Sequence, residues 1–110
     1  MIRSLDNWER EDLLEYLASH MDRSSAPGDL WRRTSLAQPE FYLAFKGSFG
    51  MSPSALLQRL RIHHAEKLLL MGKSVEQVAS ALGYRDSRSL VRAFRQLTGV
   101  TPDAWLKRRS

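Results

Sequence analysis

Residues 87–98 carry side chains that could bond to the edges of nucleic-acid bases. If this stretch is a helix with Leu90, Phe94 and Leu97 buried, five residues occupy its opposite face: Ser87, Arg88, Val91, Arg92 and Arg95. Arginine can donate two hydrogen bonds to guanine O6 and N7, serine can bond several base edges, and valine can pack on a thymine methyl. A basic helix face exposed only to water is the alternative.

The preceding residues predict a second helix and a turn that would position this face. Ser74 and Gln77 have the spacing of a capping box, which marks a helix start. The helix would bury an apolar stripe that ends before Gly83, made of Val75, Val78, Ala79 and Leu82. Asp86 would open the next helix, in which Leu90, Ala93, Phe94 and Leu97 point inward. Residues 74–98 therefore predict a helix-turn-helix, whose second helix enters a major groove.

A long helix is predicted from Pro53 to Met71. Ser52 is a suitable N-cap, proline is tolerated at the first helical position, and Gly72 suits the left-handed position after the last turn. The inward face is expected to be Leu57, Leu60, Ala65, Leu68 and Leu69, and the polar face Gln58, Arg59, Arg61, Glu66 and Lys67. At about 1.5 Å per residue the helix is roughly 28 Å long, near the repeat of B-DNA at about 34 Å.

The segments on either side of this helix resemble each other. Residues 45–57 align with residues 94–106 at a constant offset of 49, and both contain an aromatic helix end, a glycine, a Ser or Thr cap and a proline. We interpret this as an internal duplication.

The first copy is expected to contain further helices. These are a helix at Trp8–Met21 opened by an Asp6/Glu9 capping box, a loop at 23–28, a short helix at Asp29–Thr34, and a helix at Gln38–Phe49 that buries Phe41, Ala44, Phe45 and Phe49. Trp8, Trp31 and Trp105 are expected in the core, with a surface contact as the alternative for Trp31 alone. The fold class is thus all-α with about seven helices, divided into a first subdomain (1–52), a linker helix (53–72) and a second subdomain (73–110).

Charge is unevenly distributed along the 110 residues, whose formal net charge is +5. Residues 1–52 hold six Lys or Arg against eight Asp or Glu, a net of −2, whereas residues 53–110 hold eleven against four, a net of +7. The basic half favours a polyanionic partner.

Several classes of function are disfavoured. The chain has no cysteine, which excludes disulfides, thiolate metal sites and cysteine nucleophiles. No carboxylate pair, glycine-rich phosphate loop or Ser/His/Asp set indicates an enzyme, and no cofactor is expected. His63 and His64 are expected to pack or face water, since no third metal ligand has a familiar spacing. No signal peptide or membrane span is evident, so a cytoplasmic protein without membrane contact is predicted.

Four motifs resemble the C-terminal DNA-binding domain of the AraC/XylS family of bacterial transcription regulators. They are Val78-Ala79, Leu82-Gly83-Tyr84, Arg92-Ala93-Phe94-Arg95 and Gly99-Val100-Thr101-Pro102. The match is best over residues 74–109 and extends more loosely back to about Trp8. The resemblance implies seven helices, with two helix-turn-helix units on a long helix and two recognition helices in successive major grooves of double-stranded DNA. It also places Ser87, Arg88, Val91 and Arg92 where the family's second recognition helix touches bases.

The first unit departs from the family pattern. A shift of 49 residues gives an outward set of Gln38, Pro39, Tyr42, Leu43 and Lys46, with Glu40 alongside. Trp31, Ser35 and Ala37 replace the small residue, glycine and serine cap that the family usually has. We therefore expect this unit to contribute shape, a phosphate contact from Lys46 or a protein surface, with Gln38, Tyr42 and Lys46 as weak DNA contacts.

Alternative functions remain open at the level of sequence. The chain could be a helical protein-interaction module that binds RNA polymerase or another regulator through the Tyr42/Leu43 surface. The DNA-repair regulators that fuse this domain to a methyl-accepting cysteine are disfavoured by the absence of cysteine. Many family members also carry a sensor or dimerisation domain, and none fits in this length, so the chain is expected to be a domain excerpt or a stand-alone short member.

Overall fold

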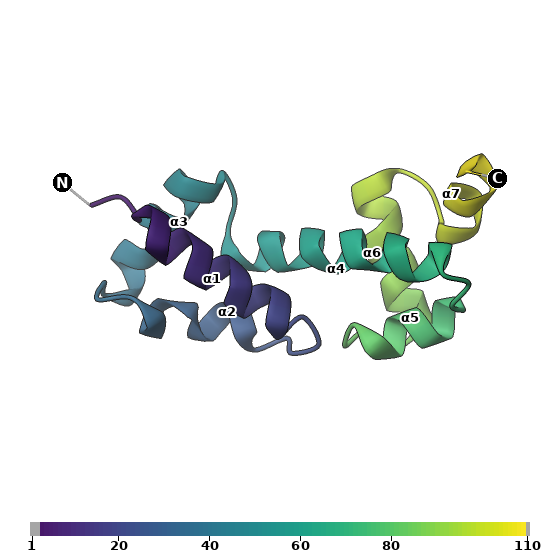
Figure 1. Ribbon diagram of the computed structural model, residues 1–110, viewed down its shortest axis with the longest axis horizontal. Coiled ribbons are helices and arrows are strands. Elements are labelled where there is room, and N and C mark those ends of the chain that lie inside the picture. The colour runs from purple at the N-terminus through teal and green to yellow at the C-terminus, as the bar shows by residue number, and fades with distance from the viewer. Residues whose placement is uncertain (1–2, 110) are drawn as a thin grey trace. The chain divides into compact units, whose positions relative to one another are not determined.

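The computed structural model describes residues 3–109, and all regular structure in that range is helical (Figure 1). The elements are α1 (Asn7–Ser19), α2 (Ala26–Asp29), the 3₁₀-helix η1 (Leu30–Arg33), α3 (Gln38–Phe49), α4 (Pro53–Leu70), α5 (Val75–Ala81), α6 (Ser87–Thr98) and α7 (Pro102–Arg109). This confirms the predicted all-α class with seven α-helices over the described residues. None of the helices within residues 3–109 is both long and apolar enough to span a membrane.

The chain divides into two compact units, and the division falls within α4. Unit 1 runs to Leu57 and unit 2 begins at Gln58. Each unit has its own set of buried side chains, so each is described separately.

A capping box starts the first helix of unit 1. Asp6 Oδ1 accepts a hydrogen bond from the Glu9 amide at 2.8 Å, and the Asp6 amide donates to Glu9 Oε1 at 3.2 Å. The Arg3 guanidinium also donates to both oxygens of Glu9, at 2.7 and 2.8 Å, and lowers the pKa of this carboxyl group. The predicted cap is therefore confirmed, and an ion pair adds to it.

The core of unit 1 is formed by apolar side chains from five elements and from the segment before α1. Its buried members are Leu5, Leu13, Leu17, Ala26, Leu30, Phe41, Ala44, Phe45 and Leu57. Phe49, predicted inside, is half-buried and stacks obliquely on Phe45, with ring centroids 4.4 Å apart. Leu14 is 39% exposed, whereas Leu13 and Leu17 are fully buried, so only part of the leucine-rich face of α1 packs in the core.

The loop and the two tryptophans of unit 1 differ from the prediction. The loop expected at 23–28 ends early, because Ala26 and Pro27 are buried in the first turn of α2. Proline is compatible with a helix start, so a serine- and proline-rich stretch can open a helix. Trp8 is 71% exposed instead of lying in the core, and Trp31 is half-buried, whereas Trp105 of unit 2 is 8% exposed.

The duplicated sequence pattern produces the same local structure twice. Gly50 ends α3 with φ +74°, and its amide donates to Lys46 O at 2.8 Å. Gly99 ends α6 with φ +84°, and its amide donates to Arg95 O at the same distance. The following caps also correspond, since Ser52 and Thr101 each accept a backbone hydrogen bond at 3.2 Å. The repeated residues therefore specify where both helices end and where the next ones begin.

The long helix α4 is confirmed, but its buried face differs from the predicted one. Ile62 and Arg61 are 4% and 7% exposed, whereas Leu60 and Leu68 are only half-buried. The helix supplies Leu57 to one core and later residues to another, so no single stripe is buried along its whole length. The predicted end is confirmed, because Gly72 has φ +89° and the Lys73 amide donates to Leu68 O at 3.1 Å.

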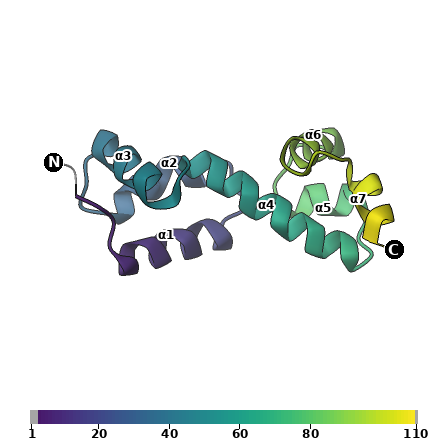
Figure 2. The same cartoon turned by 90° about the horizontal axis from the view of Figure 1, so that it is seen from above.

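Unit 2 packs α5, α6 and α7 with the second part of α4 around one apolar core. Figure 2 shows α6 nearly end-on while α4 and α5 run across the view, so α6 crosses both helices. The buried members are Ile62, Ala65, Leu69, Val78, Ala79, Leu82, Leu90, Ala93, Phe94 and Trp105. Leu97, predicted inward, is 40% exposed. It lies in the last turn of α6, beyond the part of the helix that the core covers.

Two leucines of α6 provide a matched test of this core. Leu90 is fully buried, so Leu90→Ala should lower the free energy of unfolding by roughly 2–5 kcal/mol. Leu97→Ala, the same chemical change on the same helix, should cost well under half as much. Urea denaturation followed by circular dichroism measures both. Equal losses would contradict the assigned inner face of α6.

Candidate nucleic-acid interface

An aspartate cap places the first turn of α6. Asp86 has extended backbone angles, and its Oδ1 accepts hydrogen bonds from the Ser89 amide at 2.8 Å and the Ser89 hydroxyl at 2.9 Å. These two hydrogen bonds lower the pKa of Asp86. The negative charge also interacts favourably with the helix N-terminus. The cap therefore fixes the start of the helix directly before Ser87 and Arg88.

The turn between α5 and α6 is attached to α4. The α5 helix starts with the predicted capping box, in which the Gln77 amide donates to Ser74 Oγ at 3.1 Å and the Ser74 amide donates to Gln77 Oε1 at 2.9 Å. In the turn that follows α5, the Tyr84 hydroxyl donates to Gln58 Oε1 at 3.0 Å. The Arg61 guanidinium lies 5.2 Å from the centre of the Tyr84 ring.

Burial raises the pKa of the Tyr84 hydroxyl, which lies against α4. Sequence periodicity had placed Arg61 and Gln58 on the polar face of α4, and so it missed their contacts with the turn. A buried arginine cannot be recognised from helical periodicity, because a charged residue is counted as part of the solvent-exposed face. Through these contacts, α4 helps to set the orientation of α6.

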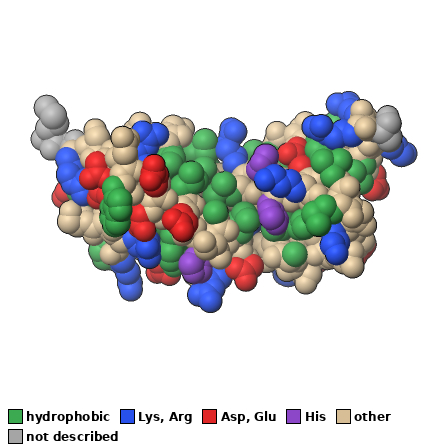
Figure 3. All heavy atoms as spheres, in the orientation of Figure 1, with side chains coloured by type: hydrophobic (Ala, Val, Ile, Leu, Met, Phe, Trp, Pro, Cys, Tyr) green, Lys and Arg blue, Asp and Glu red, His purple; other side chains and the backbone are tan. Residues whose placement is uncertain are grey.

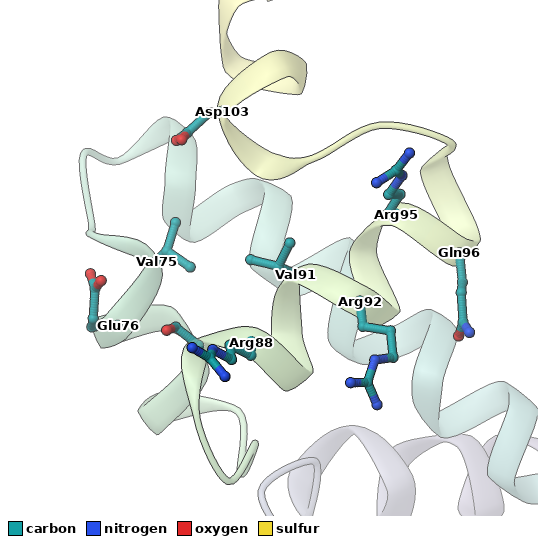
Figure 4. Close-up of a pocket in the computed structure, with 9 residues that line it drawn as sticks. Val75, Glu76, Arg88, Val91, Arg92, Arg95, Gln96 and Asp103 are labelled. Carbon is teal, nitrogen blue, oxygen red and sulfur yellow. The ribbon is translucent and has the colours of Figure 1, made fainter.

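The five residues predicted from the second unit lie together. All of them line a hollow of about 700 Å³ along α6, and its other lining residues are Val75, Glu76, Gln96 and Asp103. Figure 4 shows the side chains of Arg92, Arg95 and Gln96 toward one side of this hollow and those of Glu76 and Asp103 toward the other. Val75 and Val91 lie between them. The hollow therefore presents hydrogen-bond donors, acceptors and apolar groups on one open surface.

The arginines of this surface are available to a ligand. Arg88, Arg92 and Arg95 are exposed, and among residues 3–109 none of them has a carboxylate oxygen within 4.0 Å. In contrast, Arg33 of unit 1 donates two hydrogen bonds of 2.9 Å to Asp12. An unpaired guanidinium can form the bidentate hydrogen bonds that guanine edges and phosphates accept.

The residues predicted from the first unit form a less basic surface on α3. Gln38 and Lys46 are exposed on α3, Tyr42 is half-buried, and the Gln38 side-chain amide donates to the Tyr42 hydroxyl at 3.4 Å. Ala37 precedes α3 without a side-chain cap, whereas Asp86 caps α6. Leu43 is 61% exposed beside them. Over unit 1, Figure 3 shows acidic side chains among the basic and apolar ones, which matches the low net charge of this half.

No metal site accompanies these surfaces within residues 3–109, where no group of three His, Cys, Asp or Glu could hold an ion. His63 is exposed, and its Nδ1 lies 3.7 Å from Glu66 Oε1 on the same helix.

Comparison with known proteins identifies the family. Residues 30–108 match the family described as a helix-turn-helix domain, which is of the AraC type. The chain belongs to the AraC-type helix-turn-helix family. As a member of that family the chain carries a DNA-binding helix-turn-helix domain, as the sequence resemblance implies.

Individual relatives agree with AraC-type membership. The chain is 32% identical over 88 residues to a probable transcriptional regulator, LumQ, of Photobacterium leiognathi, with coverage of 79% of this chain and 36% of LumQ. It is 30% identical over 95 residues to the raffinose operon transcriptional regulatory protein RafR of Pediococcus pentosaceus, with coverage of 86% and 34%. The chain thus spans about a third of the length of these relatives.

A solved structure shows the same AraC-type fold. A probable AraC family transcriptional regulator from Rhodopseudomonas palustris superposes with a TM-score of 0.75 at 27% identity, and the match covers 93% of this chain and 97% of that one.

The aspartate cap of α6 can be tested without DNA. Asp86→Ala removes the acceptor for the Ser89 amide, so the first turn of α6 should fray and its amides should exchange hydrogen faster. Asp86→Asn keeps a side-chain oxygen and should retain most of the protection. Hydrogen exchange measured by NMR compares the two. Unchanged protection in Asp86→Ala would mean that the cap does not hold the helix start.

Proposed function

We propose that this AraC-type domain recognises a specific double-stranded DNA sequence chiefly through α6, which enters the major groove. The observation that carries the proposal is the gathering of unpaired Arg88, Arg92 and Arg95 with Ser87 and Val91 along one hollow. Leu90, Ala93 and Phe94, on the other side of the same helix, are buried in unit 2. One face of α6 thus packs in the core of unit 2, and the opposite face is exposed and can contact DNA.

The chemistry of the exposed face suits base recognition. Arg88 and Arg92 lie four residues apart, so they are neighbours on one helix face and can follow successive base pairs in a groove. Each can donate two hydrogen bonds to a guanine, while Val91 can pack on a thymine methyl. Ser87 and Arg95 extend this face toward the two ends of α6 and would contact base edges or the adjoining phosphates.

Unit 1 is proposed as the weaker partner in DNA binding. Lys46 would contribute a phosphate contact, and Gln38 and Tyr42 would add polar contacts of limited selectivity. The single hydrogen bond from the Gln38 amide to the Tyr42 hydroxyl, at 3.4 Å, supports this role, because it holds the two side chains against each other along α3. A residue that touches only phosphate strengthens binding to all sequences alike.

We propose that the protein acts on chromosomal DNA in the bacterial cytoplasm. A DNA-bound transcription regulator can meet RNA polymerase at a promoter, which makes the polymerase a candidate partner. The exposed Leu43 of α3 is the surface in unit 1 with the apolar character that a protein contact uses.

Substitutions in the two units should have different effects. Arg88→Ala or Arg92→Ala should remove roughly 1–3 kcal/mol of discrimination between the preferred site and scrambled DNA. Lys46→Ala should lower affinity for both DNAs alike, because a phosphate contact carries no sequence information. The site is first selected from random duplexes with the unaltered protein, and competitive binding is then measured for each variant.

Salt dependence provides the control for the phosphate assignment. The logarithm of the binding constant should fall with the logarithm of salt concentration, with a slope of about 0.9 for each phosphate that the protein neutralises. Lys46→Ala removes one such contact, so the slope should become less steep by about 0.9. If Lys46→Ala or Tyr42→Ala abolishes specificity while the two arginine variants retain it, α3 is the recognition helix and the proposed asymmetry is wrong.

A further inference from the structure

The turn before α6 lies between two buried leucines. Leu82, directly after α5, is 2% exposed, and Leu90 of α6 is fully buried. Gly83 begins the turn in a left-handed conformation, with φ +81°. The chain then passes through the Asp86 cap into the first residues of the DNA-facing surface. A shift of this turn would therefore move the start of that surface.

One side chain of the turn reaches across to α4. Tyr84 is half-buried, and its hydroxyl donates to Gln58 Oε1 at 3.0 Å. Arg61 is buried, and its guanidinium lies 5.2 Å from the centre of the Tyr84 ring. The hydrogen bonds of the Asp86 side chain stay local, since both come from Ser89. Tyr84 thus ties the turn to α4, whereas the cap ties it to α6.

The two ends of α6 are held by different contacts. At the last turn, Thr98 Oγ1 lies 2.8 Å from Phe94 O and 3.0 Å from Val100 O. The buried residues Leu90, Ala93 and Phe94 lie between the two ends. Helix ends fray while a packed middle stays ordered, so the loss of a contact at one end should displace mainly that end.

We propose that Gln58 and Tyr84 are positioning residues for base recognition, which hold the first turn of α6 where Arg88 can read its base pair. The inference rests on the proposed entry of α6 into the major groove, and it requires neither residue to touch DNA. A bidentate contact from arginine to guanine needs both N–H groups aligned, so a small displacement weakens it. Arg92 and Arg95 lie beyond the first buried residue of the helix, and their contacts should not depend on Gln58.

Removal of single polar groups tests the positioning role. Sites are selected from random duplex DNA with the unaltered protein, and Arg88→Ala and Arg92→Ala then identify the base pair that depends on each arginine. Tyr84→Phe removes the hydroxyl but keeps the ring beside Arg61, and Gln58→Leu removes the acceptor. Each should reduce discrimination at the Arg88-dependent base pair about three-fold or more. Discrimination at the Arg92-dependent base pair should stay within about two-fold of its original value.

A conservative variant and a double variant separate the hydrogen bond from other effects. Gln58→Glu should preserve the preference, because a carboxylate oxygen can also accept the hydrogen bond from Tyr84. Tyr84→Phe combined with Gln58→Leu should be no more damaging than either change alone, since both remove the same hydrogen bond. Additive losses at the Arg88-dependent base pair would mean that the two residues act separately, which contradicts the proposal.

Thr98→Val is the matched control. It also removes one hydroxyl from unit 2 and nearly keeps the size of the side chain, but it acts at the opposite end of α6. Urea denaturation should show a loss of stability, while preference at the Arg88-dependent base pair stays unchanged. If Tyr84→Phe and Gln58→Leu likewise lower stability and leave every base preference unchanged, α4 only stabilises the turn and the proposal is wrong.

The proposed function and the positioning role fail in distinguishable ways. If Arg88→Ala and Arg92→Ala both leave the selected sequence unchanged, α6 does not read bases and the positioning role is wrong with it. If Arg88→Ala relaxes one base pair while Tyr84→Phe and Gln58→Leu retain it, only the positioning role is refuted. The same holds if Arg92→Ala alone relaxes the sequence. Circular dichroism shows whether each variant is folded at the assay temperature, and Tyr84→Phe decides if Gln58→Leu is not.

Discussion

The burial of one face of α6 is the constraint on which the rest of unit 2 depends. Leu90, Ala93 and Phe94 are enclosed by α4, α5 and α7, and this fixes the rotation of α6 about its own axis. Since successive residues of a helix point in set directions, the same burial determines where Arg88, Arg92 and Arg95 point. An error in the rotation of this helix would move every proposed DNA contact at once. The Asp86 cap and the Gly99 termination then define where the exposed face begins and ends.

The two units illustrate how one local design can serve different degrees of recognition. The shared cap geometry at Gly50 and Gly99 shows that both copies position a twelve-residue helix in the same way. What differs is the side chains on the outward face and the start of the helix. The second copy has unpaired arginines and an aspartate cap, whereas the first has a tyrosine, an exposed leucine and an alanine at the cap position. The first copy therefore has the same helix position but lacks the arginines that we propose to recognise bases in the second.

Much of this arrangement can be predicted from the sequence, because its signals are local. The capping boxes at Asp6 and Ser74 and the glycines at 50, 72 and 99 involve residues within one turn of each other, and the helix ends that these residues predict agree with the structure to within about two residues. The burial of Arg61 and the exposure of Trp8 could not be predicted in this way. Both depend on which neighbouring elements cover a given face, and helical periodicity carries no information about distant packing.

The same limit applies to the interface. Ser87, Arg88, Val91, Arg92 and Arg95 share one helix face, so spacing alone groups them. Glu76 and Asp103 belong to two other helices, and only the fold brings them to the same hollow. The sequence therefore indicates the basic half of the surface, and the structure adds the acidic half.

The most direct test of base recognition by α6 is a chemical change in the DNA instead of the protein. Replacing a guanine of the selected site by 7-deazaguanine removes the N7 acceptor and leaves Watson–Crick pairing intact. If Arg92 contacts that guanine, the replacement should weaken binding of the unaltered protein but have little further effect on Arg92→Ala. Arg88 can be paired with a second guanine in the same way. If every guanine replacement weakens binding of the unaltered protein and of both arginine variants by the same factor, α6 does not make these contacts and the account is contradicted.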